Sequence, residues 1–377
     1  MKRLVLSPRP NWEARVAEQG ISFACVDGKP YWDESAAYEF TAAEIDRIEA
    51  ATNELHRICL EAGQTIVDRR WYDRLGLPPA AIPLIEASWE ADEPSLYGRF
   101  DLACDGEGAI KMLEYNADTP TALVEAAVAQ WYWLEDLYPG CDQFNSLHER
   151  LVKAWRFYAD KTGAERIHLC ALRESLEDNQ TILYLEDTLR SAKIACARLP
   201  VEDIGWDGQR LVDWDAEPIA HLFKLYPWEW MLHEEYGPHI AASGARFLEP
   251  AWKMLLSSKG LLPILWELYP DHPNLLPAYR TEDAKLGGNF VRKPLFSREG
   301  ANVEIHRGGV CVNRTEGPYG EEGWVWQAIA GLAEFDGRRP ILGSWVINHE
   351  SAGMGIREDA QPISTNNSRF IPHLFRD

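Results

Sequence analysis

Four polar side chains in the first third of the chain could bind metal ions and phosphate. Arg99 and Asp101 lie two residues apart, and so do Glu114 and Asn116. Two carboxylates and an amide supply the oxygen ligands that a hard cation such as Mg²⁺ prefers. An arginine beside them would suit a phosphoryl group or an oxyanion. These residue types predict a metal and phosphate site, provided that the chain folds them onto one surface.

A β-hairpin would bring these side chains together. The segment 99–104 alternates in the period of a strand, 105–108 gives a turn signal, and 109–116 reads as the return strand. If the turn closes the hairpin directly, residues whose numbers add up to 213 face each other, so Asp101 would pair with Met112.

In this register Arg99 pairs with Glu114, and the four polar side chains share one face of the hairpin. Phe100, Leu102 and Cys104 would be buried on the other face. A single bulge would change the register. The alternative interpretation is a solvated hairpin face that carries a cross-strand Arg–Glu pair.

A second candidate site combines basic and small residues between two predicted strands. Lys293 ends the strand 289–294, and Arg298 lies in the loop that leads to the strand 301–306. A lysine on a strand can reach phosphate oxygens, and a loop of small residues can present backbone N–H groups to them. Arg298 could contact a transferring γ-phosphoryl group. The alternative is an ordinary hairpin with surface charges.

The elements around these sites predict a mixed α+β and α/β fold. Thr41 and Glu44 form a capping box for a helix toward Ala62, which Gly63 would interrupt or end. Strands and a helix alternate between 165 and 235, which indicates an α/β subdomain. Further helices are expected at 121–137, 146–162, 178–192 and 250–270, the last with a break at Pro263, and further strands at 167–171, 194–199, 219–225, 324–329 and 341–348.

Composition narrows the classes of partner. The 377 residues include 38 Lys and Arg against 59 Asp and Glu, a net charge of −21, which argues against nucleic acid or an anionic membrane as a partner. The seven cysteines are odd in number and form no Cys-x-x-Cys pair, so no disulfide framework or zinc knuckle is expected. The N-terminal apolar run is too short for a signal peptide, so we expect a cytoplasmic protein. Walker-type and complete dinucleotide-binding glycine motifs are absent from the sequence.

Five motifs in the same order resemble the synthetase domain of the glutathionylspermidine synthase family. They are Ser95–Asp101, Leu113–Asp118, Leu222–Glu229, Glu249–Lys253 and Arg292–Pro294. The likeness runs over roughly 5–375 and is greatest to stand-alone bacterial members without the N-terminal amidase domain, so no hydrolysis of the product is expected.

The resemblance implies an ATP-grasp fold with a preATP-grasp-like α/β subdomain. In this chain the metal-type carboxylates precede the lysines assigned to phosphate. The resemblance therefore also implies the family's rearranged connectivity. We expect an N-terminal region with the carboxylate hairpin at 1–145, the preATP-grasp-like subdomain at 146–245 and a nucleotide-binding region at 246–377. The implied activity is ATP-dependent carbon–nitrogen ligation, in which a carboxylate becomes an acyl phosphate and an amine then forms the amide.

The resemblance also implies roles for individual residues. It places Asp101, Glu114 and Asn116 on two Mg²⁺ ions and Arg99 on the transferring phosphoryl group. The remaining assignments are Lys259 and Lys293 on the ATP phosphates, Gln327 near the adenine, Gly300 in the cofactor-binding loop, Arg298 and Arg357 in the active-site region, and Thr119 and Thr121 on the acid substrate.

The substrates follow less directly from the sequence. Thr119 and Thr121 flank Pro120 where the bifunctional relatives have serines, which leaves the acid open between glutathione and another peptide-like carboxylate. The segment 91–140 holds ten acidic and two basic residues and could attract a polyamine. Its candidate amine contacts are Glu125, Glu135 and Asp136, each of which could instead be a carboxylate on a helix surface.

Two other functions are compatible with the sequence. A nucleotide-binding regulatory protein without ligase activity would keep the same phosphate and metal residues. The 16 tryptophans could belong to a carbohydrate-binding protein, although runs such as Trp131–Trp133 are more typical of core packing.

Overall fold

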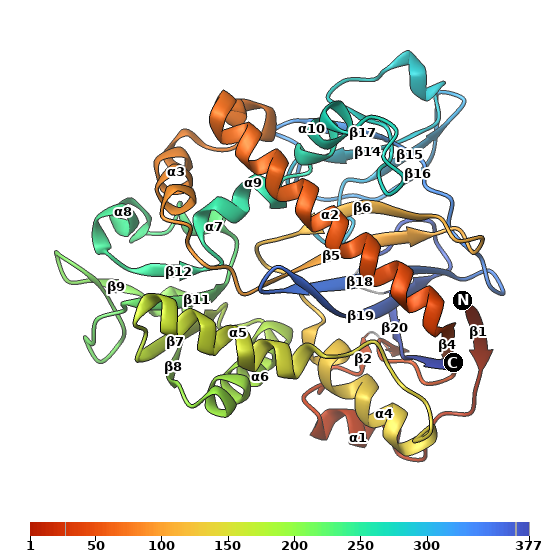
Figure 1. Cartoon of the computed structure of the whole chain (residues 1–377), viewed down its shortest axis with the longest axis horizontal. Helices are drawn as coiled ribbons and strands as arrows, with labels where there is room; N and C mark the ends of the chain where they lie inside the picture. Colours follow the sequence, from red (N-terminus) through yellow and green to blue (C-terminus); the bar gives the residue numbers. More distant parts are fainter. Residues whose placement is uncertain (27, 366–367, 377) are drawn as a thin grey trace.

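A five-stranded antiparallel sheet carries the carboxylate hairpin. The computed structural model describes residues 1–26, 28–365 and 368–376 (Figure 1). In this central sheet the strand order is β20 (Arg369–Ile371), β19 (Glu350–Asp359), β18 (Arg339–Ile347), β5 (Tyr97–Cys104) and β6 (Ile110–Asn116). The hairpin β5–β6 therefore pairs with strands from the far end of the chain, and the sheet joins the first and third expected regions.

The predicted hairpin is confirmed, but its predicted register is wrong. Asp101 lies opposite Glu114, whereas the next pair is Leu102 with Met112, so the pairing skips Leu113. The pairs nearest the turn are shifted by one residue from the predicted register, and the irregularity adds one more, so that the pairs of Arg99, Phe100 and Asp101 are shifted by two. A shift of two keeps every side chain on its face. The four polar side chains consequently still share one face.

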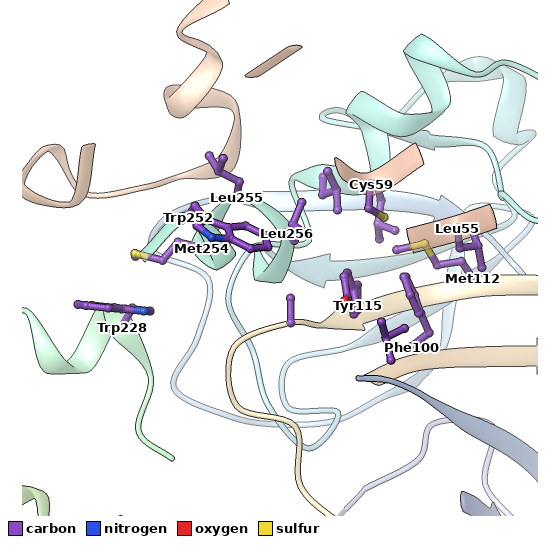
Figure 2. Packing of buried hydrophobic residues seen from close by; sticks show 14 of the residues in the cluster. Leu55, Cys59, Phe100, Met112, Tyr115, Trp228, Trp252, Met254, Leu255 and Leu256 are labelled. Carbon is purple, nitrogen blue, oxygen red and sulfur yellow. The ribbon is translucent and has the colours of Figure 1, made fainter. Parts of the chain in front are cut away.

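The other face of the hairpin is buried against helix α2 (Ala42–Arg69), which crosses the central sheet (Figure 1). Phe100 and Tyr115 stack with their ring centroids 3.9 Å apart. Figure 2 shows Leu55 and Cys59 of α2 on the same side of the hairpin as these two rings. A rigid apolar layer thus supports the polar face from behind.

Helix α2 confirms the predicted capping box and corrects its predicted end. The Thr41 side chain accepts a hydrogen bond from the Glu44 N–H, and the Glu44 side chain accepts from the Thr41 N–H. The helix continues through Gly63 to Arg69. A Cβ at position 63 would lie 2.9 Å from a ring carbon of Trp89, so this glycine permits close packing and does not break the helix.

A second five-stranded antiparallel sheet carries the basic hairpin. Its order is β13 (Ala278–Tyr279), β17 (Trp324–Ala328), β14 (Phe290–Pro294), β15 (Glu304–Arg307) and β16 (Val310–Arg314). The two strands predicted around Arg298 are confirmed as β14 and β15, and the loop between them is longer than expected.

The α/β character predicted for the alternating segment is confirmed, and its three strands join a fourth strand from beyond the segment in one parallel sheet. Its order is β12 (Arg246–Leu248), β11 (His221–Leu225), β7 (Arg166–Ala171) and β8 (Ala195–Pro200). Helices α5 (Leu147–Thr162) and α6 (Leu176–Ala192) pack beside it. The short helix α7 (Trp228–Met231) follows β11 directly.

The segment 250–270 is helical, but its predicted break is misplaced. Helix α9 (Met254–Ser257) ends before Ser258, and α10 (Leu261–Leu268) contains Pro263 in its first turn. A proline is tolerated there because the first N–H groups of a helix have no intrahelical partner. The segment 121–137 also differs from a single helix, since a π-helical turn, Glu125–Ala129, precedes α4 (Gln130–Leu137).

The remaining elements enclose these three sheets. A fourth sheet, with three strands, joins β1 (Lys2–Val5), β4 (Ala36–Thr41) and β21 (His373–Arg376). The other elements are α1 (Trp12–Glu18), β2 (Cys25–Val26), β3 (Lys29–Pro30), α3 (Ile82–Glu90), β9 (Gly205–Trp206), β10 (Leu211–Val212), α8 (Ile240–Ser243) and seven short 3₁₀ or π turns. Within the described residues, no helix combines the length and apolarity needed to cross a membrane.

Candidate active site

A cavity of about 540 Å³ is lined by all the residues that the sequence assigned to metal, nucleotide, catalytic or acid-substrate roles. The carboxylate face of the central sheet, the lysine sheet and two loops contribute to its lining. The twelve predicted site residues that line it are Arg99, Asp101, Glu114, Asn116, Thr119, Thr121, Lys259, Lys293, Arg298, Gly300, Gln327 and Arg357.

The carboxylates lie within a ring of cations. Asp101 Oδ1 accepts a hydrogen bond from Arg99 Nε at 2.9 Å, and its Oδ2 accepts from an Arg357 guanidinium nitrogen at 3.1 Å. Glu114 Oε2 lies 3.2 Å from Lys259 Nζ, and its Oε1 accepts from the Asn116 amide at 3.3 Å. Arg99 lies on β5 and Arg357 on β19, so the central sheet carries both arginines that bind Asp101.

This donor set fits Mg²⁺ bound together with phosphate oxygens. Asp101 Oδ1 and both Glu114 oxygens each accept one bond from the protein and keep a second lone pair, whereas Asp101 Oδ2 accepts from both Arg99 and Arg357. All these candidate ligand atoms are hard oxygens. Among the described side chains, no three His, Cys, Asp or Glu converge as a metal cage. Mg²⁺ commonly binds through one or two carboxylates and completes its coordination with water and substrate phosphates, so two carboxylates and an amide suffice.

The Glu114 carboxylate is ionised in spite of its burial. Burial alone would raise its pKa, but the charges of Lys259 and Lys293 and the hydrogen bond from Lys259 hold the pKa at about 2. A permanently charged carboxylate is what a metal ligand requires.

The basic hairpin meets the carboxylate hairpin at the irregularity in β6. Lys293 Nζ donates to the Leu113 carbonyl at 3.1 Å and to Gln327 Oε1 at 2.8 Å. The Gln327 amide in turn donates to the Met112 carbonyl at 3.2 Å. Gln327 is thus buried and bound to Lys293.

Burial tunes the charge of Lys293. Desolvation, helped by the charge of Lys259, lowers its pKa from 10.5 to about 8, against the opposing effect of Glu114. Lys293 is therefore positively charged in most molecules at neutral pH and loses its proton as the pH rises above 8.

This pKa predicts a pH dependence of nucleotide binding. The Kd for MgATP should rise by about tenfold between pH 7 and 9, because only about a tenth of the lysines with a pKa near 8 stay protonated at pH 9. Lys293→Arg keeps its charge throughout this range. Calorimetric titration should find its Kd constant within about twofold, and an equally steep rise in this variant would contradict the role of Lys293.

A loop arginine bridges three parts of the chain. Arg298 donates to Thr119 Oγ1 at 2.6 Å and to Glu229 Oε1 at 3.0 Å, and its guanidinium lies over the Trp230 ring. Gly300 in the same loop has φ of +68°, and a Cβ there would lie 2.2 Å from the Ser364 carbonyl oxygen. Only glycine fits this close approach, so Gly300 shapes the loop that presents Arg298.

The cavity attracts anions although the chain as a whole is strongly acidic. Seven cationic and four anionic side chains line it. Its lining also includes an apolar group that the sequence analysis did not identify, formed by Val291, Val303, Ile305, Ile329 and Ile341. Charged and apolar walls in one cavity suit a nucleotide, which has a polyanionic tail and an aromatic base.

The three candidate amine contacts lie outside the cavity lining. Glu125 is buried and accepts a hydrogen bond from the Tyr31 hydroxyl at 2.8 Å. Glu135 and Asp136 lie on the exposed side of α4, where Asp136 pairs with Arg9 and Arg15. Glu229 was not predicted as a partner of Arg298, although it ends the motif Leu222–Glu229.

Comparisons with known proteins agree with these motifs. A sequence model described as "Glutathionylspermidine synthase preATP-grasp" matches residues 3–376. A Haemophilus influenzae protein provisionally named an acid–amine ligase is 45% identical, with both chains covered over their full length.

Two longer relatives match as well. A Crithidia fasciculata trypanothione synthetase is 28% identical over 84% of this chain, and an Escherichia coli bifunctional glutathionylspermidine synthetase/amidase is 25% identical over 89%. This chain spans 53% and 58% of their respective lengths. The resemblance inferred from the motifs is confirmed: the chain belongs to the glutathionylspermidine synthase family.

Proposed function

We propose that this chain is an ATP-dependent ligase that joins a carboxylate to an amine through an acyl phosphate. The observation that carries the proposal is the meeting of the two charged hairpins in one cavity. Metal-type oxygen ligands on one sheet face Lys293 on another, with Lys259 from the turn between α9 and α10 and several arginines beside them. Phosphoryl transfer requires this combination of positioned cations and metal ligands. The names of the family relatives support the same reaction class.

The first step transfers a phosphoryl group. A carboxylate oxygen of the acid attacks the γ-phosphorus of ATP, the bond to the β–γ bridging oxygen breaks, and ADP leaves. Lys259 and Lys293 hold the phosphates, while Asp101, Glu114 and Asn116 would hold Mg²⁺. When bound, Mg²⁺ supplies charge neutralisation on the phosphate oxygens. Arg99 and Arg357, already directed at Asp101, stabilise the charge of the transferring group.

The second step forms the amide. The amine nitrogen attacks the carbonyl carbon of the acyl phosphate, phosphate leaves with the bonding electron pair, and the nitrogen loses a proton. Arg298, Thr119 and Thr121 surround the position that we propose for the acid. Holding both reactants in one cavity away from water favours amide formation over hydrolysis.

The finer parts of the proposal concern fold and substrates. We propose an ATP-grasp nucleotide-binding unit in 246–377 and a preATP-grasp-like unit in 146–245, to which the parallel sheet belongs. For the acid we propose a peptide-like carboxylate such as the glycyl end of glutathione, and for the amine a polyamine. Relatives named for glutathionylspermidine and trypanothione synthesis support this choice, and so does the net charge of −21.

The test is ADP release in a matrix of acids and amines. Purified protein with MgATP is incubated with glutathione and small peptides against polyamines and amino acids, and the mixtures are analysed by mass spectrometry. ADP release that needs one acid and one amine, with a product lighter by one water than their sum, is the expected result. MgATP binding without product in any mixture would favour a nucleotide-binding regulator instead.

A further inference from the structure

A buried ion pair lies directly behind the loop that carries the proposed acid contacts. Lys224 Nζ and Asp118 Oδ1 are 2.5 Å apart. The exposed fractions are 0% for Lys224 and 4% for Asp118. Lys224 lies on β11 of the parallel sheet, and Asp118 follows the metal-type residue Asn116 and precedes Thr119. The pair therefore connects two units that the proposed function treats as separate.

Both oxygens of Asp118 are bound by the same short segment of chain. The second oxygen, Oδ2, accepts a hydrogen bond from the Trp228 N–H at 3.0 Å. Lys224 also donates to the Tyr226 carbonyl at 3.0 Å and lies 4.9 Å from the Trp228 ring centroid. The segment 224–228 thus fixes the position and the orientation of the Asp118 carboxylate.

The residues after Asp118 bind the active-site arginines. Thr119 Oγ1 accepts from Arg298 at 2.6 Å, and the Thr121 carbonyl accepts from Arg99 at 2.6 Å. On the other side of Arg298, Glu229 follows Trp228 directly and binds the same guanidinium. The contacts of both arginines consequently depend on where Asp118 anchors the loop.

Stability alone is a weak reason for such a pair. Taking two charges out of water costs free energy that their attraction only partly offsets, and a well-packed apolar pair would often be as stable. A lysine and a carboxylate do, however, fix one geometry, because the pair has to keep its contact to avoid an unpaired buried charge.

We propose that Lys224 is a positioning residue for the acid subsite, acting through Asp118. It holds the loop 117–122 so that Thr119 and the Thr121 carbonyl meet the two arginines. This inference rests on the proposed function for its catalytic meaning. It predicts that the pair affects the acid and leaves the ATP subsite nearly unchanged, because the polar partners of Lys259 and Lys293 among the described residues lie outside the loop.

The test separates positioning from stability with three variants. Asp118→Asn leaves the Lys224 ammonium buried without its counter-charge, and Asp118→Asn/Lys224→Met removes both charges. Glu34→Gln is the matched control, since Glu34 and Arg9 form another buried pair, 2.6 Å apart, that does not line the cavity. Thermal melting, the Kd for MgATP, amide hydrogen exchange of 117–122, and ADP release with glutathione and spermidine are measured for each.

We expect the double variant to recover thermal stability relative to Asp118→Asn without recovering the loop. Exchange in 117–122 should stay at least about tenfold faster than in wild type, and the KM for glutathione should stay raised by a similar factor. The Kd for MgATP should change by less than about twofold, and Glu34→Gln should alter neither the exchange of 117–122 nor the KM.

The inference is overturned if loop exchange in the double variant returns to the wild-type rate together with the melting temperature. Failure of the proposed function has a different signature, namely a wild-type protein that forms no condensed product in any mixture, whether or not it binds MgATP. The exchange measurement still decides in that case whether Lys224 holds the loop.

Discussion

Asp101→Asn is expected to lower the rate of MgATP-dependent ADP release by at least about a hundredfold. The substitution keeps the size of the side chain but removes a metal-type carboxylate that lies opposite Glu114 and between two arginines. With its charge gone, Arg99 and Arg357 lose their common anionic partner, and the proposed Mg²⁺ ligands fall to one carboxylate. Loss of a single preorganised electrostatic group in an active site typically costs a factor of this size.

The measurement is the rate of ADP release as a function of Mg²⁺ concentration, with far-UV circular dichroism to verify the fold. Asp105→Asn is the matched control on the same hairpin. Asp105 accepts the N–H groups of Glu107, Gly108 and Ala109 in the turn and does not line the cavity. It should weaken the turn while leaving turnover within about threefold of wild type. Turnover at the wild-type rate in Asp101→Asn would refute the metal assignment.

Lys293→Met should raise the Kd for MgATP by about 10- to 100-fold. Lys293 is 8% exposed, and its ammonium donates to the Leu113 carbonyl and the Gln327 side-chain oxygen. Neither acceptor is charged, so the ammonium is free to pair with a phosphate. Hydrogen bonds to charged groups contribute about 1.5–3 kcal/mol, and 1.4 kcal/mol corresponds to a factor of ten in affinity.

Isothermal titration with MgATP gives this affinity without any knowledge of the acid or amine. Lys285→Met serves as the control, because Lys285 is an exposed lysine outside the cavity lining. It should bind MgATP as the wild type does. An unchanged Kd in Lys293→Met would place the phosphates elsewhere in the cavity.

The sequence was sufficient to predict the two hairpins and the residues that meet between them. Alternation and turn residues report local geometry, so β5–β6 and β14–β15 were predictable. The shared face of Arg99, Asp101, Glu114 and Asn116 survived the wrong register because the shift near these residues is even. Had the pairing moved by one residue, the metal ligands would have been divided between two faces.

Other features depend on contacts that no local pattern encodes. Gly63 looked like a helix end, but Trp89 packs against its bare backbone within a continuous helix. Pro263 looked like a break, although it occupies a first turn where no hydrogen bond is lost. The short strands β1, β20 and β21 were missed because each has only three or four residues and gains its partners from distant segments.

The sequence predicted which residues belong to the candidate site, and the structure adds the hydrogen bonds and ion pairs that join them. Nothing in the spacing of Lys293 indicated that its ammonium would meet the carbonyl of Leu113, because that carbonyl is presented where the pairing of β5 with β6 skips a residue. The partners of Asp118 and Arg298 in the segment 224–229 likewise come from the parallel sheet and the short helix after it, and the spacing of motifs along the chain does not reveal that they meet.

The pairing of β5 with β18 constrains the order in which the molecule can be built. Asp101 on β5 lies opposite Gly343 on β18. Because the chain is synthesised from its N-terminus, the carboxylate hairpin leaves the ribosome long before β18 has been made. Until then one edge of β5 has no partner, and closing so long a loop slows folding. The parallel sheet, whose strands all lie between 166 and 248, can assemble earlier. We therefore expect nascent chains that stop short of 339 to contain an ordered α/β unit but no working metal site, and these chains to be the ones that engage chaperones.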